Sequence, residues 1–131
     1  MCWTTTQFRF IPNAFIYLLL TVTANAFAAT EQEIATDQEI THLLDFVEHS
    51  RCNFNRNGTV HKSLEARQHM ELKYGYAKRW VGTAEDFIKY TATQSTISKR
   101  PYHVVCDGQQ IPSAEWLIGE LKKYRDNNLK G

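Results

Sequence analysis

The first run of apolar residues lies at the N-terminus and is short. From Ile11 to Val22 the chain is mostly apolar over about a dozen residues, whereas a membrane-spanning helix needs about 20. Ala26-Phe27-Ala28 follows and fits the A-x-A pattern of a signal-peptide cleavage site. We therefore expect residues 1–28 to be a secretory signal and residues 29–131 to form a single domain. An uncleaved membrane anchor is the alternative that this pattern leaves open.

Beyond the leader, apolar residues recur at helical spacing in four segments. Thr36 and Glu39 fit a capping box, and the apolar stripe from Ile40 to Val47 predicts a helix over residues 37–49. A second helix is expected over residues 64–80, a third from about residue 84 to 92, and a fourth from residue 113. Their expected N-terminal residues are Ser63, Thr83 and Pro112-Ser113. The residues expected to face the core from these three helices are Ala66, Met70, Tyr76, Ala77, Trp80, Phe87, Ile88, Thr91, Ala92, Leu117, Ile118, Leu121 and Tyr124.

Strand patterns occupy two short segments. Residues 52–61 contain Asn57-Gly58, the strongest short hairpin signal, because a type I′ turn requires positive φ at both central residues. Residues 102–106 are β-branched and aromatic, and the turn Asp107-Gly108 follows them. We find no internal repeat. Four helices with a small antiparallel sheet predict an α+β fold.

Two cysteines remain once the leader is removed, Cys52 and Cys106. An even number of cysteines in an exported protein favours a disulfide. The loop that it would close holds about 54 residues, and the loop-closure entropy is then worth about 4 kcal/mol. Two buried free thiols and a redox pair are the alternatives, although a redox pair usually has the spacing C-x-x-C, which this chain lacks.

Composition adds limits on function. The 131 residues carry 15 basic and 14 acidic side chains, so the formal net charge is +1. A nearly neutral chain offers no electrostatic case for binding nucleic acid or an anionic membrane surface. No cofactor is expected, and a metal site fails on spacing, because no H-x-x-x-H occurs and His42 and His49 are seven residues apart. The match of Asn57-Gly58-Thr59 to a glycosylation sequon is taken as accidental.

The order of four motifs resembles a known family. They are C-x-F-x-R-N-G at residues 52–58, A-x-x-H-x-x-x-K at 66–73, T-A-E-x-F-I at 83–88 and S-x-x-S-x-x-P-Y-x-V at 95–104. Together they resemble the YfeK-like family of small exported bacterial proteins of unknown function. The resemblance implies a bacterial, periplasmic protein and implies no activity. This chain departs from the family pattern just before Pro101, where Ser98-Lys99-Arg100 stands in place of a glycine.

Two polar residues fall within the apolar face of the second predicted helix. At 100° per residue, His69 lies about 60° and Lys73 about 20° from Ala66. Polar groups in a buried stripe need partners. One interpretation is a small pocket for an anionic or sugar-like ligand, and the favoured one is a structural network from which Lys73 extends its amine outward. The candidate ligand-binding residues are Arg56, Asn57, His69, Lys73, Ser95 and Ser98, with Glu85 and Asp86 as further possible partners.

These observations predict a periplasmic or secreted binding or envelope-associated module without catalysis. Its partner would be an envelope protein or a glycan, with no nucleic acid and no stable membrane insertion after signal cleavage. The alternatives are a weak hydrolase that uses His69 with Ser95 or Ser98, and a protein inhibitor of a hydrolase. Trp116 lies outside the apolar stripe of its helix, so it either packs under a loop or marks a partner surface.

Overall fold

The computed structural model describes residues 14–130, which divide into two units at the boundary between Gln32 and Glu33. Residues 1–13 of the expected signal segment lie outside the described residues. The first helix, α1, spans Ala14–His49. Among the described residues no helix is both long and apolar enough to cross a membrane.

The expected start of the first helix is wrong, although its end at His49 is confirmed. Thr36 is not an N-cap but a buried residue inside α1, where its Oγ1 lies 3.5 Å from the carbonyl oxygen of Gly82. Residues 28–36 contain neither Gly nor Pro and are rich in Ala, Glu and Gln, which are good helix formers. A capping-box pattern in such a segment does not force a helix to begin.

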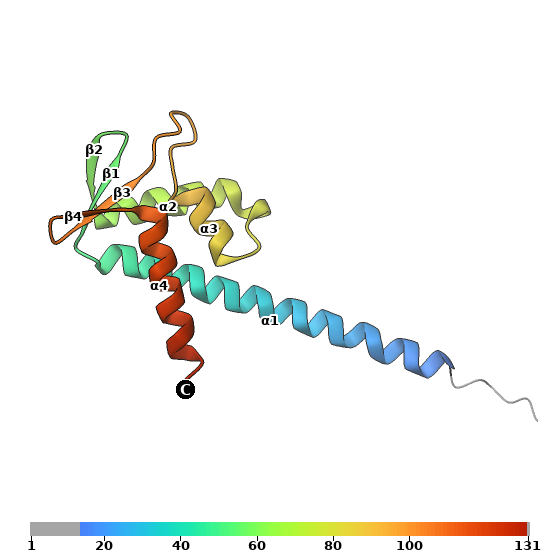
Figure 1. The fold of residues 1–131 in the computed structure, drawn as a ribbon. Coiled ribbons are helices and arrows are strands. Elements are labelled where there is room, and N and C mark those ends of the chain that lie inside the picture. Colours follow the sequence, from blue (N-terminus) through green and yellow to red (C-terminus); the bar gives the residue numbers. More distant parts are fainter. Residues whose placement is uncertain (1–13, 131) are drawn as a thin grey trace, which may run out of the picture. The chain divides into compact units, whose positions relative to one another are not determined.

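The sheet has four antiparallel strands in the order β2-β1-β3-β4 (Figure 1). The strands are β1 (Asn53–Arg56), β2 (Thr59–Lys62), β3 (His103–Cys106) and β4 (Gln109–Pro112). Both expected turns are confirmed, with φ of 56° and 83° at Asn57 and Gly58 and of 50° and 77° at Asp107 and Gly108. Strand β4 was not expected, because its two glutamines and its proline give it a weak strand pattern. Proline is tolerated there because β4 is an edge strand.

The two hairpins are related by an internal repeat, so the expectation of no repeat is wrong. A shift of 50 residues places β1–β2 on β3–β4, and Phe54 pairs across the sheet with its own equivalent, Val104. Equivalent strands share one burial pattern, and each hairpin leads directly into a helix. The repeat is difficult to recognise in the sequence because few residues are identical between the two halves. The identical pairs are chiefly the turn glycines, Ser63 with Ser113, and the glutamates two residues after these serines.

The helix that follows the first hairpin, α2, spans Ser63–Ala77 and passes into a 3-10 turn, η1 (Lys78–Trp80). Its N-cap is Lys62 rather than Ser63, and the Glu65 carboxylate accepts a hydrogen bond from the Lys62 backbone at 3.3 Å. Its inner face is shorter than expected, since Tyr76 and Trp80 are 76% and 53% exposed. Neighbouring residues of a helix point about 100° apart, so the burial of Ala77 turns Tyr76 outward.

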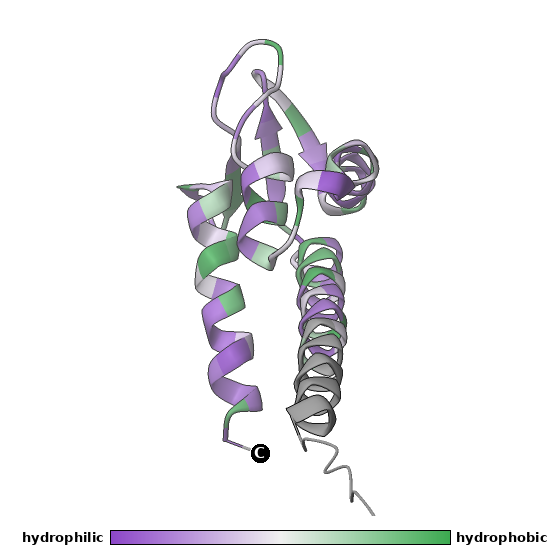
Figure 2. Cartoon of the chain, turned by 90° about the vertical axis from the view of Figure 1, so that its right-hand side faces the viewer, coloured by the Kyte–Doolittle hydropathy of each residue, from purple (hydrophilic) through white to green (hydrophobic). Residues whose placement is uncertain are grey.

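Helix α3 (Ala84–Thr91) matches the expectation. The Thr83 hydroxyl caps it by accepting a hydrogen bond from the Asp86 backbone N–H at 3.1 Å, and its four expected inner residues are buried. Helix α4 spans Ser113–Asn128. Its apolar residues gather in the N-terminal half, whereas the C-terminal half is hydrophilic (Figure 2).

In α4, Leu117 and Leu121 are buried as expected, but Ile118 is 44% exposed. Tyr124 is half-buried and stacks on the His42 ring at 4.2 Å. Trp116 is one of the partly buried residues that pack against the core. Its ring lies 4.5 Å from that of Phe46 and 5.7 Å from that of Phe54, against the core.

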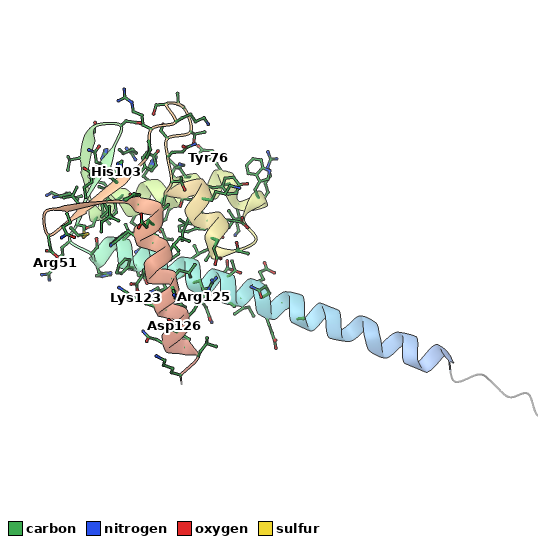
Figure 3. All side chains as sticks on the ribbon, in the orientation of Figure 1. Arg51, Tyr76, His103, Lys123, Arg125 and Asp126 are labelled. Carbon is green, nitrogen blue, oxygen red and sulfur yellow. A yellow bond between two sulfur atoms is a disulfide. The ribbon has the colours of Figure 1, made fainter. Side chains whose placement is uncertain are left out.

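A disulfide and a group of ion pairs connect elements of the second unit. The predicted disulfide between Cys52 and Cys106 is confirmed and ties together the two central strands, with a Cα–Cα distance of 4.8 Å. The guanidinium of Arg125 (Figure 3) donates to Glu39 of α1 at 2.6 and 2.8 Å and also to Glu85 of α3. The expected α+β architecture, four helices with a small antiparallel sheet, is confirmed.

Candidate functional site

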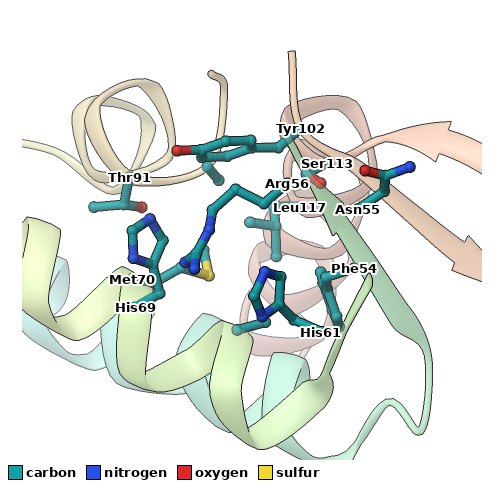
Figure 4. A pocket seen from close by; sticks show the side chains of 12 residues that line it. Phe54, Asn55, Arg56, His61, His69, Met70, Thr91, Tyr102, Ser113 and Leu117 are labelled. Atoms are coloured by element: carbon teal, nitrogen blue, oxygen red, sulfur yellow. The ribbon is translucent and has the colours of Figure 1, made fainter. Parts of the chain in front are cut away.

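A small cavity lies between the sheet and helix α2 (Figure 4). It has a volume of about 40 Å³, room for a small chemical group rather than a whole drug-sized ligand. Its apolar wall comes from the buried side chains Phe54, Ala66, Met70, Ala92 and Leu117. Its polar lining residues are Asn55, Arg56, His61, His69, Thr91, Tyr102 and Ser113.

Arg56 supplies the charge of this cavity. It ends β1, where the alternation of a strand places it on the same face as Phe54. Figure 4 shows its guanidinium reaching down from the strand beside the ring of His69. No acidic residue lines the cavity, and within residues 14–130 no carboxylate forms an ion pair with Arg56. Arg56 is half-buried, so part of its hydration is lost without compensation from the protein.

His69 lies in the same cavity without a hydrogen-bond partner. Its Nε2 atom is buried and makes no hydrogen bond within the described chain, and its ring meets that of Tyr102 edge to face at 6.1 Å. Burial, reinforced by the positive charges of Arg56, Lys73 and His61, lowers the pKa of His69 to about 4. The imidazole is therefore neutral at pH 7, and its unpartnered nitrogen can donate or accept a hydrogen bond.

A second unpartnered group is Ser113, the first residue of α4. Its side chain is buried, with 5% exposure, and its hydroxyl has no hydrogen-bond partner in the described part of the chain. Buried polar atoms are nearly always paired, so unpaired ones call for an explanation. Thr91, by contrast, satisfies its hydroxyl by donating to the Phe87 carbonyl at 2.8 Å. The cavity, whose exposed lining is mostly apolar, is thus bordered by the Arg56 guanidinium and by two polar atoms that lack a hydrogen-bond partner within the described chain.

Lys73 borders this cavity without lining it. Its Nζ donates to the carbonyl of Gln94 at 3.0 Å and lies 5.1 Å from the centre of the Tyr102 ring. Burial, together with the charges of Arg56 and Lys99, lowers the pKa of Lys73. Tyr102 is therefore the side chain that stands between Lys73 and the cavity, and burial raises the pKa of its hydroxyl.

The remaining three predicted residues gather at the loop that follows α3. Ser98 donates from its hydroxyl to the side-chain oxygen of Asn57 at 2.6 Å, and Ser95 accepts at 3.2 Å from the backbone N–H of Ser98. These contacts hold the loop after α3 against the β1–β2 turn. The structure therefore brings Arg56 and His69 together, places Lys73 beside them, and sets Asn57 and Ser98 apart. Ser95 lies between the two groups, because its side chain also interacts with Tyr102, which lines the cavity.

This arrangement does not join His69 to a serine hydroxyl, as the hydrolase alternative requires. The His69 Nε2 has no partner, and the Ser98 hydroxyl is engaged by Asn57. Nor does any group of three or more His, Cys, Asp or Glu side chains in the described residues have the placement of a metal site. The two helical histidines considered for one are engaged separately, His42 with Glu120 at 2.9 Å and His49 with the Asp45 carbonyl at 2.8 Å.

Tyr102 and Ser113 line the cavity but are not among the candidate ligand-binding residues predicted from the sequence. The sequence pattern predicts Tyr102 only as part of a strand and Ser113 only as the start of a helix. Both reach the cavity because β3 pairs with β1. The fourth motif of the family resemblance is the sequence signal that comes nearest to Tyr102, since it ends on Pro-Tyr-x-Val.

Comparison with known proteins places the chain in a family. Residues 34–125 match the Family of unknown function (DUF5329), so the chain belongs to that family, and the matched segment contains every residue of the cavity. A similar protein is the "Uncharacterized protein YfeK" of Salmonella typhimurium strain LT2. The two are 34% identical over 89 residues, which cover 68% of this chain and 72% of the relative. The resemblance to YfeK-like proteins is thus confirmed. No solved structure matches the chain.

Proposed function

We propose that this protein is an exported binding module, without catalysis, that holds a small anionic group in the cavity between Arg56, His69 and Ser113. The observation that carries the proposal is a half-buried guanidinium that has no carboxylate partner and reaches into a cavity with two unpaired polar atoms. An uncompensated charge in a partly buried place is costly. A protein keeps such a group at a site where a ligand supplies the missing partner.

A carboxylate or phosphate group would satisfy all three polar groups. The guanidinium offers a planar fork of N–H donors that matches two oxygens of either anion. The neutral His69 ring can donate its Nε2 proton, and the Ser113 hydroxyl can donate its own. A cation is unsuited to the cavity, because none of the described residues that line it is acidic.

Export is the second part of the proposal. It is supported by the short apolar run followed by Ala26-Phe27-Ala28. It is also supported by the disulfide between Cys52 and Cys106, because disulfides persist in oxidising compartments such as the periplasm. The ligand would then be an anionic group of the cell envelope, carried by a protein or a glycan. Mass spectrometry of the protein from the periplasmic fraction tests this part, and an N-terminus near residue 29 is expected.

Thermal unfolding in the presence of small anions tests whether the cavity binds an anionic group. Sodium acetate and sodium phosphate, compared with chloride at constant ionic strength, should raise the melting temperature of the protein in a saturable way. Arg56→Gln should abolish that rise. Arg100→Gln is the matched control, because Arg100 is an exposed arginine outside the cavity, and it should behave like the parent protein. An equal rise in all three proteins would contradict the proposal.

A further inference from the structure

A second hollow follows the C-terminal end of α2. This aromatic groove is lined by Lys73, Tyr76, Ala77, Trp80, Tyr90 and Thr96 and has a volume of about 440 Å³. The groove is thus larger than the cavity at Arg56 and falls within the range of small-molecule sites, about 300–1,000 Å³. Tyr76 and Trp80 are 76% and 53% exposed, and the rings of Trp80 and Tyr90 lie 6.5 Å apart. Exposed aromatic rings grouped in this way are typical of interaction sites.

The rim of the aromatic groove is cationic. The Arg79 guanidinium lies 4.0 Å from the centre of the Trp80 ring, and the Lys89 ammonium lies 5.5 Å from that of Tyr90. Lys73 is itself a lining residue, and no acidic residue is one. The groove and the cavity therefore share the same charge preference, since both present cations without carboxylates to a ligand.

Lys73 connects the two features. His69, Lys73 and Trp80 are spaced by four and seven residues, which places them on one side of α2 and the turn that follows it. The distance from His69 to Trp80 is about 16 Å along the helix axis. Lys73 lines the groove, and its ammonium lies over the ring of Tyr102, which lines the cavity. A ligand that fills both features must be elongated.

We propose that the cavity and the aromatic groove form one extended site for an acidic oligosaccharide. This inference rests on the proposed function, because the acid group of one sugar unit occupies the cavity beside Arg56. Another sugar ring packs its C–H face on Trp80, which leaves its hydroxyl groups free for Lys73 and for water. Trp and Tyr suit this role because each combines a large apolar face with a polar edge.

Two other classes of occupant fit less well. A nucleic acid would also stack on aromatic rings, but the chain has a formal net charge of only +1 and so lacks the basic surface that tracks a phosphate backbone. A folded protein partner needs a contact of about 1,200 Å² or more, whereas the groove has the size of a small-molecule site. A short acidic peptide is the closest competitor and enters the test as one of its outcomes.

Isothermal titration calorimetry of the purified protein separates these possibilities. The probes are tetragalacturonate, its neutral counterpart cellotetraose, a tetraglutamate peptide and acetate. Tetragalacturonate should bind more tightly than each of the others. Trp80→Ala should weaken its binding by roughly tenfold and leave acetate binding unchanged, whereas Arg56→Gln should weaken both. Ile97→Ala is the control, since Ile97 is 94% exposed and lies outside the groove, and it should change neither.

Three results would overturn this inference and leave the proposed function standing, provided that acetate binds. They are equal affinity for the acidic and neutral tetrasaccharides, insensitivity of tetragalacturonate binding to Trp80→Ala, and tighter binding of tetraglutamate with the same dependence on Trp80. If acetate fails to bind and Arg56→Gln has no effect on any probe, the proposed function itself is wrong. The two failures are therefore distinguishable within one set of titrations.

Discussion

Replacing His69 by Gln should remove a pH dependence from the stability of the protein. In the folded state the pKa of His69 is lowered from 6.5 to about 4, first by burial and then by the charges of Arg56, Lys73 and His61. The unfolded chain therefore binds a proton at His69 between pH 6.5 and 4, while the folded chain does not. Stability contributed by the neutral ring is fully present above pH 6.5 and is lost as the pH falls toward 4.

The size of the effect follows from these two pKa values. Between pH 7 and pH 5 they give a loss of about 2 kcal/mol in the free energy of unfolding. The ring is only partly buried, so solvent screening reduces the expected loss to about 1 kcal/mol. An anion in the cavity opposes the loss, because it stabilises the protonated ring and so raises the pKa of His69.

Urea unfolding of the parent protein and of His69→Gln at pH 7 and pH 5 measures how much His69 contributes to the pH dependence of stability. The parent protein should lose about 1 kcal/mol more than His69→Gln over this interval. His103→Gln is the control, because His103 lies on β3 and does not line the cavity, and it should keep the dependence of the parent. If His69→Gln and the parent protein lose the same stability, His69 does not occupy the desolvated, cationic environment described here.

Three further sets of substitutions test the ion pairs, the disulfide and the backbone conformation of the fold by urea or thermal unfolding. Arg125→Met removes the hydrogen bonds to two glutamates on α1 and α3 and should lower the free energy of unfolding by about 1–2 kcal/mol. The control Lys123→Met, exposed on the same helix, should lower it little. Equal losses of stability in the two variants would contradict the role of Arg125. Cys106→Ala opens a loop of 54 residues and should cost about 4 kcal/mol, and an unchanged melting temperature would refute a structural disulfide. Gly58→Ala, at φ 83°, should destabilise the hairpin by about 1 kcal/mol. Gly75→Ala, in open space on α2, should stabilise the protein by about the same amount. Stabilisation by the first variant and destabilisation by the second would contradict the backbone conformation described here.

Elements that depend on local chemistry were predictable from the sequence. The hairpin at Asn57-Gly58 was predictable because few residues adopt positive φ at two successive positions. Helix α3 was predictable because the Thr83 cap and the apolar face that follows it agree with one another. The disulfide was predictable from the two cysteines that lie outside the expected leader, although only the fold shows why Cys52 and Cys106 meet.

Features that depend on long-range pairing were not predictable in the same way. Strand β4 has a polar sequence and exists because β3 offers it an edge. In the site, the helical period placed His69 on the buried face correctly, but it could not show that Lys73 turns to the Gln94 carbonyl. Tyr102 and Ser113 enter the cavity only through the pairing of β1 with β3, which no local pattern specifies.

The central claim is that the cavity beside Arg56 binds an anion. An NMR titration of the purified protein with phosphate at constant ionic strength tests it most directly. Resonances of the His69 ring and of the Ser113 backbone amide should shift together along one saturable curve, and Arg56→Gln should abolish both shifts. Shifts confined to exposed lysines, or changes that grow linearly without saturation, would contradict the claim.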